Sequence, residues 1–211
     1  VEEHFYLFYP VVLLFLMRKF KKNGAAVGLA ILCVVVLLWR NYLFIIQEVP
    51  VDRIYFGTDT RIDSILYGCI LALTWNPVDA KPSSSFTTKE LLITGAAGAV
   101  FIGTIFYREP IYRETFRYTL QGLCMMPLFY YAINKADHIF FSWLNWGWMR
   151  KLGVYSYGMY LIHYVVIGIL QQHTWFDSKI ILLGTTLALS ILFAYIVDEY
   201  VDNSFKGLRA K

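Results

Sequence analysis

The sequence begins with Val1-Glu2-Glu3-His4-Phe5-Tyr6-Leu7-Phe8-Tyr9-Pro10, in which ionisable side chains lead directly into an apolar run that continues to residue 17. On a helix, Glu2, Tyr6 and Pro10 follow one another at intervals of four residues and share one face. A carboxylate within hydrocarbon costs roughly 3 kcal/mol, so it usually pairs, faces a cavity or has a function. The alternative is that both acids only cap the start of the helix at the headgroup level.

The composition is that of a membrane protein, because 58% of the residues are apolar, only 16% are charged, and the mean hydropathy is +0.51. A soluble domain carries about 25% charged residues. We therefore predict an all-α fold, a single polytopic transmembrane bundle over residues 1–211 with about seven spanning segments. The expected segments are residues 3–17, 25–46, 62–75, 91–107, 119–133, 154–170 and 180–197.

The basic residues indicate the orientation of this bundle. Loops after the odd-numbered segments carry about twice as many Lys and Arg residues as those on the opposite side. The positive-inside rule therefore predicts a multi-pass protein of the cell (inner) membrane with a cytoplasmic C-terminus, and places Glu2 and Arg61 toward the outside.

Several other classes of function find no support in the sequence. The net charge of +4 is modest and scattered, which argues against a nucleic-acid partner. The three cysteines lie in different apolar runs without a C-x-x-C or Cys/His spacing, so neither a metal site nor a disulfide framework is expected.

A second polar stretch, residues 53–64, runs directly into the third apolar segment. Thr58 or Asp59 can cap a helix there. Arg61 offers a planar fork for carboxylate or phosphate oxygens, and Asp59 and Asp63 are candidates to hold it in position. We take Arg53, Asp59, Arg61 and Asp63 as candidate substrate-binding residues; the alternative is a salt-bridge cluster at the membrane edge.

A third stretch, residues 152–163, places Ser156, Tyr160 and His163 on one face of a helix expected to be buried. A histidine in a spanning helix commonly faces the bundle interior and bonds to a neighbouring hydroxyl. It can instead act as a general base, because its pKa lies near neutral pH. Both readings stay open, with His163 as a candidate catalytic residue and Ser156 and Tyr160 as candidate substrate-binding residues.

These three stretches resemble, in the same order, three motifs of the acyltransferase 3 family of integral-membrane O-acyltransferases. In the first motif, Ser-x-Ser-Val-Glu-x-Gln-Phe-Tyr-Leu-x-x-Pro, the matching residues are Val1, Glu2, Phe5, Tyr6, Leu7 and Pro10, with His4 where Gln is usual. The second resemblance is Tyr-x-Gly-Thr-Asp-Thr-Arg-x-Asp, and the third is Gly-x-x-Ser-Tyr-x-x-Tyr-Leu-x-His.

The resemblance implies transfer of an acyl group, commonly acetyl, to a hydroxyl of a cell-surface carbohydrate or lipid-linked sugar. The donor is expected to be acyl-CoA (acetyl-CoA) as a substrate, with no bound cofactor. Glu2 and Tyr6, together with His163, are the expected catalytic residues, and Arg61 is the expected anion or oxyanion partner.

The family's usual catalytic histidine belongs to an earlier helix and has no counterpart in these residues. We therefore expect the chain to be a C-terminal portion whose partners include membrane lipid and missing N-terminal helices of the same protein. On this expectation the fragment alone is inactive.

Two further hypotheses remain open. A non-enzymatic transporter or flippase component would use the same ionisable residues as a substrate or proton path. Alternatively, the chain is an inert structural subunit of a membrane complex, whose charges all cap helices.

Overall fold

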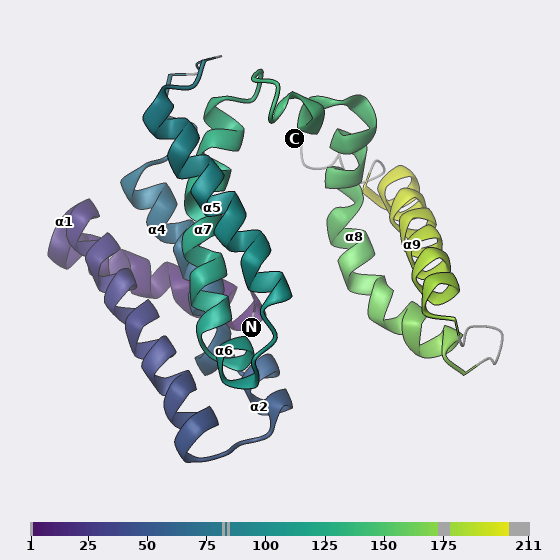
Figure 1. Ribbon diagram of the computed structural model, residues 1–211, viewed down its shortest axis with the longest axis horizontal. Coiled ribbons are helices and arrows are strands. Elements are labelled where there is room, and N and C mark those ends of the chain that lie inside the picture. Colours follow the sequence, from purple (N-terminus) through teal and green to yellow (C-terminus); the bar gives the residue numbers. More distant parts are fainter. Residues whose placement is uncertain (1, 82, 84, 173–177, 203–211) are drawn as a thin grey trace. The chain divides into compact units, whose positions relative to one another are not determined.

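The computed structural model describes residues 2–81, 83, 85–172 and 178–202, without the side chains of Glu2, Val201 and Asp202. Every regular element within these ranges is a helix. The chain forms two compact units, residues 1–138 and 139–211, and each is described by itself (Figure 1).

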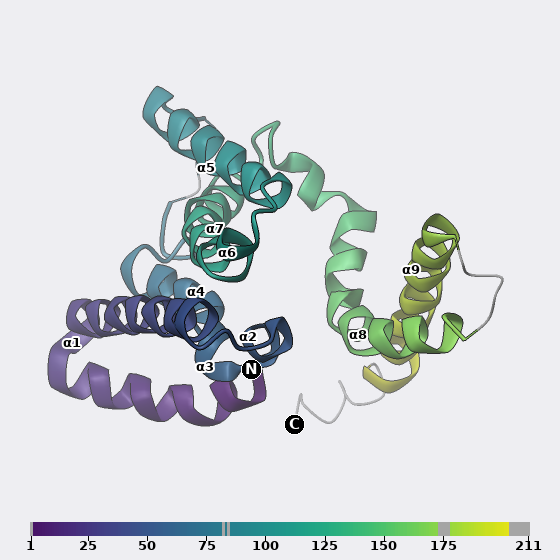
Figure 2. The same cartoon turned by 60° about the horizontal axis from the view of Figure 1, so that its bottom comes forward.

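Helix α1 (Glu2–Asn41) covers the first two predicted segments. A break at Lys21, whose φ of 56° is left-handed, divides it into two helical stretches. Figure 2 shows the chain reversing direction near this point, so the second stretch runs back beside the first. A π-helical turn, η1 (Tyr42–Ile46), continues the second stretch. The loop expected between the first two segments, residues 18–24, is thus reduced to a backbone break.

Three helices follow without long connections: α2 (Val51–Phe56), α3 (Thr58–Arg61) and α4 (Asp63–Thr74). Helix α5 (Thr88–Phe106) packs along α7 (Phe116–Asn134), and the short α6 (Pro110–Glu114) joins them (Figure 1). The core of this unit lies where α1 meets α4, with Leu29, Cys33, Leu66 and Tyr67 at its centre.

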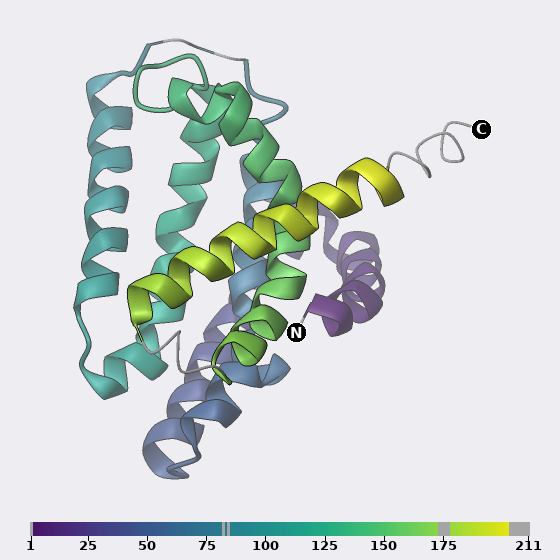
Figure 3. The ribbon, with the colours of Figure 1, turned by 90° about the vertical axis from the view of Figure 1, so that its right-hand side faces the viewer.

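The second unit consists of η2 (Ser142–Asn145), α8 (Gly147–Leu170), α9 (Lys179–Ile196) and the π-helical η4 (Val197–Asp202). Helices α8 and α9 pack against each other (Figure 3). Their contact is close because Gly158 has no side chain: a Cβ there would lie 3.0 Å from the Cβ of Ala194.

The all-α prediction is confirmed for the described residues, and each of the seven apolar segments is helical there. Four helices of the described part are long and apolar enough to cross a membrane: Glu3–Ile46, Thr88–Phe106, Gly147–Leu170 and Lys179–Tyr200. The predicted number of about seven crossings is not confirmed. The first two segments form one long broken helix, and the 12 residues of α4 fall short of the roughly 20 that a span needs.

Candidate functional site

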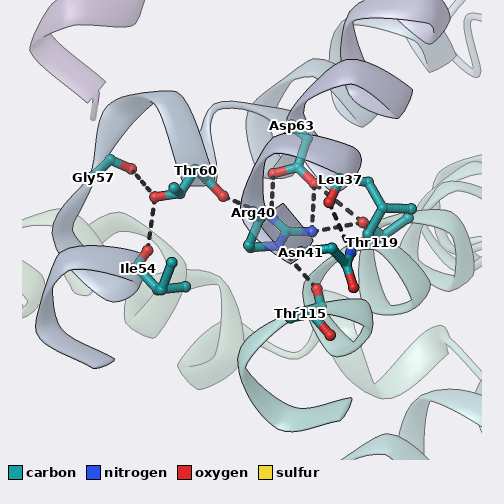
Figure 4. Close-up of polar contacts among 9 residues, drawn as sticks. All are labelled: Leu37, Arg40, Asn41, Ile54, Gly57, Thr60, Asp63, Thr115 and Thr119. Carbon is teal, nitrogen blue, oxygen red and sulfur yellow. Dashed lines mark hydrogen bonds and ion pairs between the residues drawn. The ribbon is translucent and has the colours of Figure 1, made fainter. Parts of the chain in front are cut away.

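Arg40 and Asp63 form a fully buried ion pair in the first unit (Figure 4). Arg40 faces the carboxylate with two nitrogens: Nη1 is 3.1 Å from Oδ1 and Nη2 is 3.1 Å from Oδ2. The remaining donors bond the backbone oxygens of Thr60 (2.6 Å) and Thr115 (2.9 Å) and the Thr119 hydroxyl (2.7 Å). All five N–H groups of the guanidinium are therefore used.

This ion pair holds together elements that are distant in the sequence. Arg40 lies at the end of the second stretch of α1, and Asp63 begins α4. Thr115 directly precedes α7, and Thr119 lies in its first turn. Because every N–H group of Arg40 is already bonded, none remains to bind a substrate, and the role of the buried pair is structural.

The two acids predicted to hold Arg61 pair with other arginines. Asp63 pairs with Arg40, and Asp59 accepts two hydrogen bonds from Arg53, at 2.9 and 2.7 Å. That predicted pairing is wrong because residues two apart in a helical segment, such as 59 and 61 or 61 and 63, do not face each other.

The Arg53–Asp59 pair lies on the surface, with about 43% and 44% of the two side chains exposed. The indole nitrogen of Trp39 donates a third hydrogen bond, 2.7 Å long, to Asp59. The hydrogen bonds from Arg53, supported by the one from Trp39, hold the pKa of the Asp59 carboxyl below its usual value. This cluster links α1 with α2 and α3.

Arg61 itself has buried donors without a partner. Its Nε and Nη1 atoms are buried and make no hydrogen bond to the described residues. The guanidinium lies over the ring of Tyr118, 3.8 Å from the centroid. A buried donor without a partner is costly, so this arginine is positioned to receive an acceptor that the protein alone does not supply.

A pocket of about 330 Å³, the Arg61 pocket, opens beside this guanidinium. Its walls come from the α3–α4 segment, α5 and α7. The lining residues are Arg61, Ser64, Tyr67, Gly68, Leu71, Phe101, Tyr118, Gln121, Gly122, Met125, Met126 and Phe129. The lining thus includes one cationic residue, three residues with hydroxyl groups and one amide among apolar residues, a composition suited to a small polar or anionic group.

Positive charge exceeds negative charge around Tyr118. Besides Arg61, the guanidinium of Arg117 lies 5.0 Å from the ring centroid, and its Nε is buried without a hydrogen bond. The nearby carboxylate of Glu114 pairs with Arg113. No carboxylate of the described residues lies within ion-pair distance of Arg61 or Arg117. The region therefore attracts anions.

The first and second sequence motifs lie next to each other. Nδ1 of His4, near the start of α1, lies 2.9 Å from the Thr58 hydroxyl at the start of α3. Neither Thr58 nor Asp59 caps a helix as predicted, because Gly57 occupies the N-cap position of α3 and no side chain bonds there. The Thr58 hydroxyl instead connects the two motifs.

Tyr6 does not face the Arg61 pocket, since 73% of its side chain is exposed on the surface of the chain. Pro10 shares that exposed face, whereas Phe5 and Tyr9 pack on the core. Glu2 begins α1, but its side chain lies outside the described part of the structure. Its catalytic role therefore stays a prediction.

The third motif lies on α8 in the second unit. Ser156 donates to the Gly153 carbonyl at 2.7 Å, and Nδ1 of His163 lies 2.5 Å from the Tyr160 carbonyl oxygen. Ser156 and Tyr160 are exposed and His163 is half-buried. The expectation of a buried face is therefore wrong for these residues within their own unit, because α8 packs on α9 through the side that carries Gly158.

Sequence reasoning missed Arg40, Arg117 and Tyr118. The signal for Arg40 was present, because an arginine inside a hydrocarbon-length apolar run needs a partner. Arg117 and Tyr118 stand at the start of an apolar segment, where charge and aromatic residues are common at any membrane interface and carry no specific signal.

The fold and this site belong to a defined class of membrane protein. The model of the family described as "Acyltransferase domain" matches residues 1–199, and the chain belongs to this family. It is thus a membrane-embedded helical acyltransferase domain, in agreement with the resemblance of its three motifs. No solved structure matches the chain.

Curated relatives make the similarity more specific. The chain is 32% identical over 175 residues to "O-acetyltransferase OatA" of Staphylococcus aureus (strain NCTC 8325 / PS 47), covering 79% of this chain and 28% of the relative. It is 28% identical over 235 residues to "Peptidoglycan O-acetyltransferase OatA" of Listeria monocytogenes serovar 1/2a (strain ATCC BAA-679 / EGD-e), covering 100% of this chain and 36% of the relative. The chain therefore spans about a third of the length of these relatives.

Proposed function

We propose that this chain is the part of a membrane O-acetyltransferase that transfers an acetyl group from acetyl-CoA to a hydroxyl of a cell-wall glycan such as peptidoglycan. The observation that carries the proposal is Arg61, a half-buried cation with two buried, unpartnered nitrogens beside a pocket, in a member of an acyltransferase family. The relatives named as an O-acetyltransferase and a peptidoglycan O-acetyltransferase support the acetyl group and the glycan acceptor.

Acyl transfer creates negative charge that this arginine is suited to stabilise. The acceptor oxygen attacks the thioester carbonyl carbon, the carbonyl oxygen becomes an oxyanion, and the carbon–sulfur bond then breaks to release coenzyme A. The proton of the acceptor hydroxyl passes to a base, for which Glu2 and His163 are the candidates in this chain. The unpartnered N–H groups of Arg61 donate to the oxyanion or to a phosphate of a substrate.

Acetyl transfer is tested with membranes from cells that produce the protein as its gene encodes it, incubated with radiolabelled acetyl-CoA. Replacing Arg61 by Gln is expected to lower the label reaching glycan by about 100-fold, the loss typical of a removed oxyanion donor. Arg150→Gln removes the same charge from an exposed position of α8 and is expected to leave transfer unchanged.

The same assay tests Glu2 and the alternative of transport. Glu2→Gln is expected to abolish labelling while protein levels stay equal. Full labelling in Arg61→Gln would refute the role of this arginine, and flux of substrate across the membrane without transfer of label would favour a transporter.

A further inference from the structure

A second and more apolar pocket adjoins the Arg61 pocket. It has a volume of about 560 Å³, and we call it the Trp75 pocket. Its lining residues are Leu71, Trp75, Ile93, Leu123, Met126, Pro127, Tyr130 and Tyr131. Leu71 of α4 and Met126 of α7 line both pockets. The two pockets are therefore neighbours within the groove bounded by α4, α5 and α7.

Together the pockets form an amphipathic track along α4. The polar end has Arg61, the last residue of α3, and the apolar end has Trp75, which follows α4. At 1.5 Å per residue, the 14 steps from Arg61 to Trp75 correspond to about 21 Å. This exceeds the ~15 Å of hydrocarbon in one membrane leaflet, so the track is long enough for an extended lipid chain.

The chemistry of the two ends is complementary to one kind of molecule. The apolar end consists of aromatic and aliphatic side chains, which favour hydrocarbon. The polar end has the unpartnered nitrogens of Arg61 and the excess positive charge around Tyr118, which favour a phosphate. An entirely apolar molecule would leave the Arg61 donors without acceptors, and a free phosphate would leave the Trp75 pocket empty.

We propose that the track binds a lipid phosphate, with the phosphate at Arg61 and the hydrocarbon chain in the Trp75 pocket. The inference rests on the proposed function in one respect, because both use the Arg61 pocket. It adds to that function that the acceptor sugar is carried on a lipid phosphate. Two sources share this chemistry: a sugar-carrying polyprenyl phosphate and an ordinary anionic phospholipid.

Binding is measured directly, independent of acetyl transfer, on purified protein freed of lipid and given phosphatidylglycerol or phosphatidylcholine with a brominated chain. Bromine quenches nearby tryptophan fluorescence, and the part that depends on Trp75 is, in the parent and in each variant, the difference from the same protein with Trp75→Phe. Ile93→Trp fills the Trp75 pocket, and Leu92→Trp places the same side chain on the exposed neighbouring position. Arg61→Gln removes the phosphate contact, and Arg150→Gln is its matched control.

Phosphatidylglycerol is expected to bind the parent protein at least tenfold more tightly than phosphatidylcholine. Arg61→Gln should abolish this preference, and Ile93→Trp should weaken binding of both lipids about tenfold. Leu92→Trp and Arg150→Gln should behave like the parent. Equal binding by Arg61→Gln, Ile93→Trp and the parent would overturn the proposal.

Competition experiments identify the source of the lipid phosphate. Displacement of phosphatidylglycerol by a tenfold lower concentration of polyprenyl phosphate identifies a carrier lipid, and equal potency identifies bulk phospholipid. If coenzyme A displaces phosphatidylglycerol and Ile93→Trp weakens this displacement, the track binds the acetyl donor and the proposal is overturned. If the protein binds lipid as expected but no acetyl transfer is found, the proposed function is refuted and the lipid-binding proposal stands.

Discussion

Two arginines separated by 21 positions serve different purposes because their donors are used differently. Arg40 has every N–H group bonded and is closed to ligands. Arg61 has buried nitrogens without acceptors and lies at a pocket. At the residue scale, the number of free donors separates a structural arginine from a candidate functional one.

Replacing Arg40 by Met should lower the free energy of unfolding by about 3–5 kcal/mol, because Asp63 is left buried without a positively charged partner. Replacing both residues, as Arg40→Met with Asp63→Leu, should recover most of this loss. Unfolding in mixed micelles, followed by circular dichroism, measures both effects. The matched control is Arg53→Met, which removes an exposed pair and should cost ~1 kcal/mol or less. Equal costs for the two single variants would contradict a structural role specific to the buried pair.

The Arg53–Asp59 pair gives a prediction on pH dependence. Because the pKa of Asp59 is lowered in the folded protein, its stabilising contribution is complete above the unfolded value near 3.9 and is lost as pH falls through the lower folded pKa. The stability difference between parent and Asp59→Asn should therefore be constant from pH 5 to 7 and shrink below about pH 4. Thermal unfolding across this range measures it, and a difference that grows on acidification would contradict the assignment.

At the scale of elements, the packing of α4 against α7 depends on a glycine. A Cβ at position 122 would lie 2.1 Å from a ring carbon of Tyr67, so no side chain fits there without moving that ring. Tyr67 and Gly122 both line the Arg61 pocket, so the same close approach sets the shape of the pocket.

Gly122→Ala should therefore lower the melting temperature by several degrees and also reduce acetyl transfer, because the displaced Tyr67 ring reshapes the pocket. Gly103→Ala on α5 is the matched control, since its Cβ would meet no atom within 4 Å. It should be neutral or slightly stabilising, as alanine is favoured over glycine in a helix. A harmless Gly122→Ala would show that α4 and α7 do not approach this closely.

At the scale of the whole molecule, the question is how the helices cross the bilayer. The break at Lys21 divides α1 into two stretches that reverse direction, which allows both to cross although they form one continuous helical element. Helix α4 is too short to span by itself, and it contributes residues to both pockets of the track.

If both stretches of α1 cross, the residues on either side of the second stretch lie on opposite membrane faces. Single cysteines at Lys22 and Glu48, in a variant with the native cysteines replaced by Ser, should react with an impermeant maleimide from opposite sides. The excess of basic residues around Lys22 predicts that this position is cytoplasmic. Labelling of both positions from the same side would show that the second stretch does not cross.

The sequence by itself was sufficient for the all-α class, the positions of the apolar helices and the family. Apolar length and hydropathy reflect the energetics of each segment in a bilayer and need no knowledge of its neighbours. The tertiary structure alone decided which charges pair. Asp63 contacts Arg40 rather than the nearer Arg61 because the direction of a side chain from its helix, and not its distance along the chain, determines its partner. That choice leaves Arg61 with free donors, because its neighbours in sequence point away from it.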